Sequence, residues 1–99
     1  MKRVFLFVVV FLSISALSLA QNLKVSGLVT DQKNEALVGV NINVKESYIG
    51  TPTNSNGKYS LKLKPGDYTL VFSYIGYEKK EKKISLKDKN IELNISMQP

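Results

Sequence analysis

The chain has 99 residues, with 14 Lys and Arg residues against 8 Asp and Glu residues, and it contains neither histidine nor cysteine. Without cysteine, disulfides, thiol catalysis and thiolate metal sites are excluded, and without histidine the common nucleophile–base pairs are excluded too. This length allows one small domain, which we expect to be marginally stable.

Residues 1–20 predict a cleavable signal peptide. Two basic residues, Lys2 and Arg3, precede an unbroken apolar run at residues 4–12, and small side chains lead up to Ala20. A retained membrane anchor is the alternative, but a spanning helix needs about 20 apolar residues, and this run is shorter and interrupted by serines. We therefore expect cleavage after Ala20, export, and no membrane span in the mature protein.

The mature chain, residues 21–99, keeps 12 lysines against 8 acidic residues, which is a net charge of +4. It contains no arginine, the residue that makes bidentate contacts to guanine and phosphate. We therefore expect no nucleic-acid partner.

Alternation of apolar and polar residues with a period of two dominates the mature chain, and no helical stripe is sustained. The pattern predicts strands over residues 23–30 and 40–45, the second rich in β-branched side chains. Between them, Asp31 is expected to accept backbone N–H bonds in the loop, as aspartate does in Asx-turns. A short extended segment follows, with Pro52 suited to a sheet edge.

Turn signals then divide the middle of the chain. Asn56-Gly57 is typical of a tight turn, and residues 58–64 alternate as a strand. Pro65-Gly66 predicts the two central positions of a type II turn. The next strand is expected over residues 68–74, and Gly76 predicts a bulge or bend after it.

The C-terminal part predicts a lysine-rich strand up to residue 86 and one last strand over residues 91–97. An edge strand protected by charge is the favoured interpretation of the lysines, and contact with anionic lipid or polysaccharide is the alternative. These lysines are Lys79, Lys80, Lys82, Lys83, Lys87 and Lys89. In total, about seven short strands predict an all-β sandwich.

Several matched segments resemble the carboxypeptidase regulatory-like domain. They are Gly27-x-Val29-x-Asp31, Leu37-x-Gly39-Val40-x-Ile42-x-Val44, Gly50-Thr51-x-Thr53-x-x-x-Gly57-x-Tyr59-x-Leu61 and Ser73-Tyr74-Ile75-Gly76-Tyr77. The resemblance runs from about Lys24 to Met97 and implies a seven-stranded, transthyretin-like (Ig-like) β-sandwich. In Gram-negative envelopes it implies a periplasmic domain like the one that leads TonB-dependent outer-membrane receptors. In carboxypeptidases, it implies a non-catalytic neighbour of the catalytic domain.

The residues give little support to chemistry. Ser60 beside a lysine could form a Ser–Lys dyad, but a hydroxyl on the wet face of a strand is the simpler interpretation. Asn54-x-Asn56-Gly57 lacks the carboxylates of a calcium loop. Members of the family that the chain resembles often have an aspartate where this chain has Asn54, so a simple turn is favoured over a cation site. The acidic residues fit ordinary solvated charges better than a paired-carboxylate glycosidase site. We expect no enzyme activity, no metal and no cofactor.

The sequence therefore predicts a non-catalytic exported interaction module, in the periplasm or at the outer-membrane periphery of a Gram-negative bacterium. Its partners are expected to be envelope or outer-membrane proteins. The candidate partner-binding residues flank glycines near strand ends, and rigid rings contribute contact area at low entropy cost. They are Tyr48, Tyr74, Ile75 and Tyr77. A small carbohydrate-binding module, disfavoured by the absence of tryptophan, and the leading fragment of a disrupted outer-membrane receptor are the alternatives.

Overall fold

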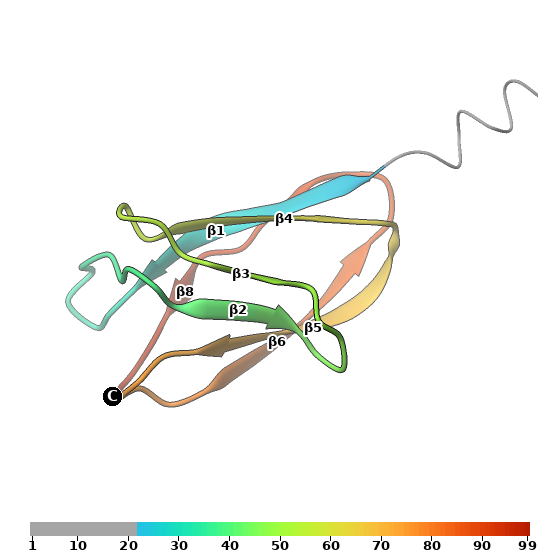
Figure 1. Cartoon of the computed structure of the whole chain (residues 1–99). Helices are drawn as coiled ribbons and strands as arrows, with labels where there is room; N and C mark the ends of the chain where they lie inside the picture. Colours follow the sequence, from blue (N-terminus) through green and yellow to red (C-terminus); the bar gives the residue numbers. More distant parts are fainter. Residues whose placement is uncertain (1–21) are drawn as a thin grey trace, which may run out of the picture.

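The computed structural model describes residues 22–99, so the predicted signal peptide lies outside the described residues. Two β-sheets lie face to face and enclose one apolar core (Figure 1). Residues 22–99 contain no helix long and apolar enough to cross a membrane. The expected all-β sandwich is confirmed.

The first sheet is built around β1 (Leu23–Thr30). On one side β1 pairs antiparallel with β4 (Lys58–Leu63), and on the other it pairs parallel with β7 (Ile91–Glu92) and β8 (Ile95–Ser96). The first and last strands of the domain are thus direct neighbours.

The second sheet has the order β3-β2-β5-β6 and is antiparallel throughout. Its strands are β2 (Asn41–Val44), β3 (Gly50–Pro52), β5 (Gly66–Ser73) and β6 (Lys80–Leu86). Both edge expectations are confirmed, because Pro52 lies in edge strand β3 and the lysine-rich segment forms edge strand β6. On β6, Lys80 and Lys82 pair with the buried residues Phe72 and Leu70, so charged residues occupy the inward face of this edge.

The core follows from the alternation read in the sequence. Along β4, every second residue is buried and the residues between are exposed. Each aliphatic or aromatic side chain that becomes fully buried contributes about 1.5–3 kcal/mol of hydrophobic stabilisation. The buried apolar residues are Val25, Val29, Val40, Ile42, Val44, Tyr59, Leu61, Leu63, Leu70, Phe72, Leu86, Ile95 and Met97.

The expected number of strands, seven, is wrong, because residues 22–99 form eight. The single strand expected over residues 91–97 is divided into β7 and β8, although both keep one register against β1. At the division, Oδ1 of Asn94 accepts the Leu28 N–H at 2.9 Å, and just before β7 Oδ1 of Asn90 accepts the Lys24 N–H in the same way at 2.8 Å. Side-chain amides therefore take the place of backbone carbonyls in the ladder, and the strand is interrupted.

Two short polar side chains shape the loops as expected. Asp31 Oδ1 accepts the N–H groups two and four residues downstream, at 2.8 and 3.0 Å. Asn54 Oδ1 does the same for Asn56 and Lys58, at 2.9 and 3.0 Å, and Gly57 follows with a φ of 75°. Asn54 therefore organises a turn, as the sequence favoured over a calcium loop.

The type II turn expected at Pro65-Gly66 is wrong. Gly66 has a nearly extended φ of 159° and already begins β5, where it pairs with Leu86. The Tyr68 hydroxyl donates a hydrogen bond to the Lys64 carbonyl at 2.8 Å, so a side chain closes this connection.

Gly27 marks the closest approach of the three strands in the first sheet. It pairs with Tyr59 on β4, and the Tyr59 hydroxyl donates a hydrogen bond of 2.7 Å to the Leu93 carbonyl, beside β7. A Cβ atom placed on Gly27 would lie 1.8 Å from that carbonyl oxygen. Glycine is required here because backbone and ring occupy the space of a side chain.

Burial raises the pKa of Tyr59 to about 12, from the usual tyrosine value of 10.0. Because the folded pKa lies above the unfolded one, the stabilisation from the neutral phenol is complete below about pH 10 and is lost as the pH rises toward 12. We expect Tyr59→Phe to cost about 1–2 kcal/mol at neutral pH, through the lost hydrogen bond to Leu93. The variant should also lose less stability than the wild type above pH 10.

Urea unfolding followed by circular dichroism, from pH 7 to about pH 11.5, measures both effects. Tyr68→Phe is the matched control, because it removes a phenol whose hydrogen bond lies at the surface. If the free energy of unfolding falls equally with pH in the wild type and in Tyr59→Phe above pH 10, the role given to Tyr59 is contradicted.

Candidate functional site

Residues 74–77, here called the aromatic turn, connect β5 to β6. The Tyr77 N–H donates a hydrogen bond to the Tyr74 carbonyl at 3.1 Å, and Gly76, at the third position, has a φ of 86°. These features define a type II turn and confirm the bend expected at Gly76. Ile75 occupies the second position and is 97% exposed.

The flanks of the aromatic turn are held in place. The rings of Tyr74 and Tyr77 have centroids 5.6 Å apart with planes inclined at 39°, and both pack against the core. A hollow of about 440 Å³ lies beside them, bordered by Gly39 and by Lys79. Next to Gly39, Val38 is 52% exposed. The turn therefore presents an exposed aliphatic tip on a fixed aromatic base.

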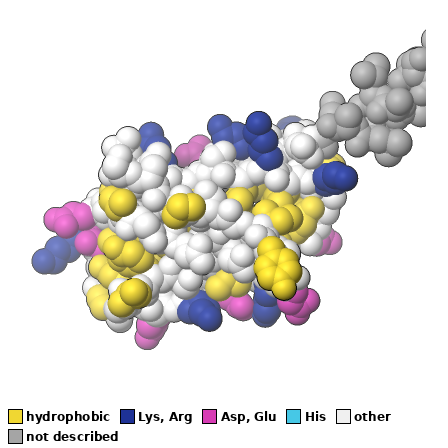
Figure 2. Space-filling model, in the orientation of Figure 1, with side chains coloured by type: hydrophobic (Ala, Val, Ile, Leu, Met, Phe, Trp, Pro, Cys, Tyr) yellow, Lys and Arg dark blue, Asp and Glu magenta, His cyan; other side chains and the backbone are white. Residues whose placement is uncertain are grey.

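The structure places Tyr48 apart from the other three candidate residues. Tyr48 lies in the connection between β2 and β3, beyond Val44, and its side chain is fully exposed. The other end of β2 is the one near the aromatic turn, because Asn41 pairs with Ser73. Three of the four candidates thus share one end of the sandwich, where Figure 2 shows exposed apolar side chains, and Tyr48 lies at the opposite end.

The aromatic end offers apolar contact area and little reactive chemistry. Tyr77 also borders a second hollow of about 290 Å³, together with Asp31, Glu35 and Pro99. Across residues 22–99, no group of three or more acidic side chains is placed to hold a metal ion. The arrangement can bind an apolar or aromatic surface.

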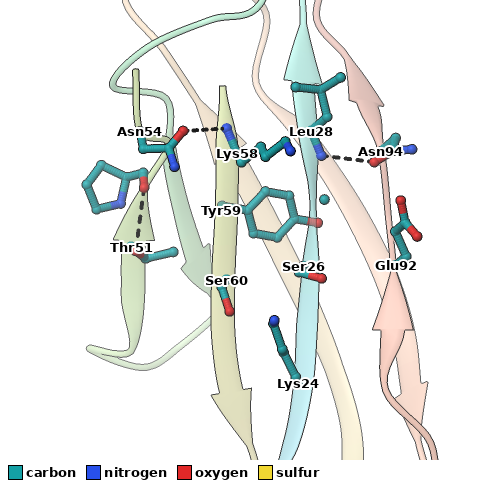
Figure 3. Close-up of a pocket in the computed structure, with 12 residues that line it drawn as sticks. Lys24, Ser26, Leu28, Thr51, Asn54, Lys58, Tyr59, Ser60, Glu92 and Asn94 are labelled. Carbon is teal, nitrogen blue, oxygen red and sulfur yellow. Dashed lines mark hydrogen bonds between the residues drawn. The ribbon is translucent and has the colours of Figure 1, made fainter. Parts of the chain in front are cut away.

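A larger polar hollow lies on the outer face of the first sheet (Figure 3). Its volume is about 650 Å³, and small hydroxyl side chains, Ser26 on β1 and Ser60 on β4, lie opposite one another in it. Lys24 and Lys58 border it on these strands, and Glu92 borders it on β7. Ser60 is exposed, as the sequence favoured. Sequence reasoning missed this hollow because its residues become neighbours only through the pairing of distant strands.

The fold and the exposed turn together define a small Ig-like β-sandwich domain. The model of the CarboxypepD_reg-like domain family matches residues 25–99, and the chain belongs to this family. The resemblance found in the sequence is thereby confirmed.

Among curated proteins, the chain is similar to TonB-dependent receptors. It is 42% identical over 72 residues to TonB-dependent receptor SusC of Bacteroides thetaiotaomicron, which is 73% of this chain and 7% of that receptor. It is 36% identical over 77 residues to TonB-dependent receptor P39 of Formosa agariphila, which is 78% of this chain and again 7% of the receptor. The match thus spans a small part of each receptor.

Among solved structures, the Bacillus anthracis TIE protein has a similar fold. The TM-score is 0.65 at 21% sequence identity, over 78% of this chain and 16% of that one. At this identity, the likeness concerns the fold alone.

Proposed function

We propose that the chain is an exported, non-catalytic interaction module of a Gram-negative envelope, and that it docks onto an outer-membrane receptor protein through the aromatic turn. One observation carries the proposal: Ile75 is 97% exposed at the tip of a hydrogen-bonded turn whose flanking rings are fixed. Turn tips usually carry polar residues or glycine, so an isoleucine there provides no folding advantage. A rigid apolar tip is suited to insertion into a partner's pocket.

The relatives support the choice of partner. Two receptors named TonB-dependent carry a segment similar to this chain, and in each the segment is 7% of the protein. A domain that accompanies such receptors would meet receptor surfaces in the periplasm or at the outer-membrane periphery. The signal peptide predicted at residues 1–20 would deliver the chain to that side of the inner membrane.

The composition and the fold also support a non-catalytic role. The chain has no histidine or cysteine to act as base or nucleophile. The phenol whose pKa is raised by burial belongs to Tyr59, and its proton is committed to the Leu93 carbonyl within the fold. The Tyr59 phenol, whose pKa is raised, therefore has a structural role.

A photoreactive residue at position 75 tests the docking. We expect benzoylphenylalanine in place of Ile75, in cells of a Gram-negative host that produces TonB-dependent receptors, to form a covalent adduct with an outer-membrane receptor, identified by mass spectrometry. The same residue in place of Lys87 is the control, because Lys87 is exposed at the other end of β6. The same adduct from both positions, or no receptor among the adducts of position 75, would refute the proposal.

The variant Ile75→Ser separates docking from folding. Because the side chain contributes almost nothing to the core, the urea midpoint should correspond to a stability within about 0.5 kcal/mol of the wild type. Affinity for the receptor found by cross-linking should fall by about tenfold or more, as expected for a central apolar anchor. Unchanged affinity would show that the aromatic turn is not the contact.

A further inference from the structure

The outer face of the first sheet carries an unbalanced positive charge. Lys24 on β1 lies directly opposite Lys62 on β4, and Lys58 lies on the same face of β4. Like charges in directly opposed positions destabilise a sheet. Within residues 22–99 the one ion pair joins Lys45 to Glu81 at 3.3 Å, and these residues, just after β2 and on β6, are not part of the first sheet. The three lysines therefore face solvent without an acidic partner among the described residues.

Figure 2 shows lysine side chains along the side of the molecule formed by β1 and β4. Two of these lysines, Lys24 and Lys58, line the polar hollow of Figure 3, and Glu92 is its one acidic lining residue. The face thus combines a depression with a net positive potential, which attracts anions.

The hollow is lined by groups that suit sugar hydroxyls. Ser26 and Ser60 are opposed across β1 and β4 and supply hydroxyl groups that both donate and accept. Asn94 Oδ1 is occupied by the Leu28 N–H, and among the described residues its amide N–H donors have no acceptor. The large apolar residues that line the hollow are Leu28, which is half-buried, and Tyr59, which is buried, so neither is exposed enough to enter a bilayer.

The spacing of the charges favours an elongated ligand. Lys58 and Lys62 are four residues apart on one strand face, which corresponds to about 13 Å. The opposed hydroxyls of Ser26 and Ser60 lie between these two positions. A ligand that matches this face has negative charges separated by a stretch of hydroxyl groups.

We propose that the outer face of the first sheet binds a short acidic oligosaccharide. Its carboxylates would pair with Lys24 and Lys62 at one end and with Lys58 at the other. Its hydroxyls would bond to Ser26, Ser60 and Asn94 between these lysines. This site is separate from the aromatic turn, and its test does not depend on the proposed docking.

Titration calorimetry of the purified protein with an oligogalacturonate of defined length tests the site. The triple variant Lys24→Gln/Lys58→Gln/Lys62→Gln should bind about tenfold more weakly or worse, because it loses the paired charges. The control Lys82→Gln/Lys83→Gln/Lys87→Gln removes the same charge from β6 and its flank, and should bind within about twofold of the wild type. Amide NMR shifts should change at Ser26 and Ser60 and stay constant on β6.

Further probes distinguish the ligand class. A neutral dextran oligosaccharide, a poly-glutamate peptide and vesicles of phosphatidylglycerol should each bind more weakly than the oligogalacturonate. Equal binding of any one would overturn the proposal, since recognition would then need hydroxyls alone, charge alone or a lipid surface. An equal loss of affinity in both triple variants would also overturn it. Urea midpoints of both triples show that each remains folded.

Discussion

Replacing Gly27 by alanine is expected to cost more than about 3 kcal/mol, beyond the usual range for an overpacked interior position. The added Cβ would lie 1.8 Å from the Leu93 carbonyl oxygen and 3.1 Å from the Tyr59 ring. The nearer atom belongs to the backbone, so it can move only if the segment joining β7 and β8 leaves β1. A domain of 78 described residues has a total stability of roughly 4–12 kcal/mol, so much of it would be lost.

Urea unfolding of Gly27→Ala, followed by far-ultraviolet circular dichroism, measures this loss. Ser26→Ala is the control on the same strand, because Ser26 faces the polar hollow and not the core, and its stability should change by about 0.5 kcal/mol or less. If Gly27→Ala unfolds at the wild-type midpoint, then the close approach of Leu93 is not required for the fold.

Replacing Phe72 by alanine is expected to cost about 3–5 kcal/mol, the usual range for removing a buried phenylalanine. Phe72 is completely buried near the C-terminal end of β5, and its ring meets that of Tyr59 edge-on, with centroids 5.6 Å apart at 78°. This contact joins the two sheets, since β5 and β4 belong to different ones. Removing the Phe72 ring leaves a cavity between the two sheets.

The control for Phe72 keeps most of its volume. Phe72→Leu should cost less than about 1.5 kcal/mol, because volume-conserving apolar exchanges are tolerated best. Thermal and urea unfolding of both variants provide the comparison. Equal losses in the two variants would mean that the ring contact with Tyr59 matters more than the filled volume.

Local patterns in the sequence predicted most of the fold. Alternation along residues 58–63 shows directly which side chains are buried, and the loop roles of Asp31 and Asn54 need only neighbours two and four residues away. The division of the last strand could not be predicted in this way. It depends on Asn94 reaching the backbone of Leu28, 66 residues earlier in the chain.

The same limit applies to the candidate sites: residues close together in the sequence could be grouped, whereas residues brought together by strand pairing could not. The aromatic turn could be predicted because Tyr74, Ile75 and Tyr77 lie within four residues of one another. Tyr48 lies at the other end of the sandwich because it is Asn41, at the start of β2, that pairs with Ser73. The spacing of residues along the chain does not predict this pairing. The pairing of Lys24 with Lys62 could not be predicted from the sequence either, because it depends on the register of β1 against β4.

The parallel pairing of β1 with β7 and β8 has a mechanical consequence. Because neighbouring parallel strands begin at the same end, the start of β1 and the end of β8 lie at opposite ends of the sandwich (Figure 1). Tension applied between the two ends of the domain would load the hydrogen bonds between these strands in shear, all at once, instead of opening them one after another. A domain built in this way can transmit a pull along its length before it yields.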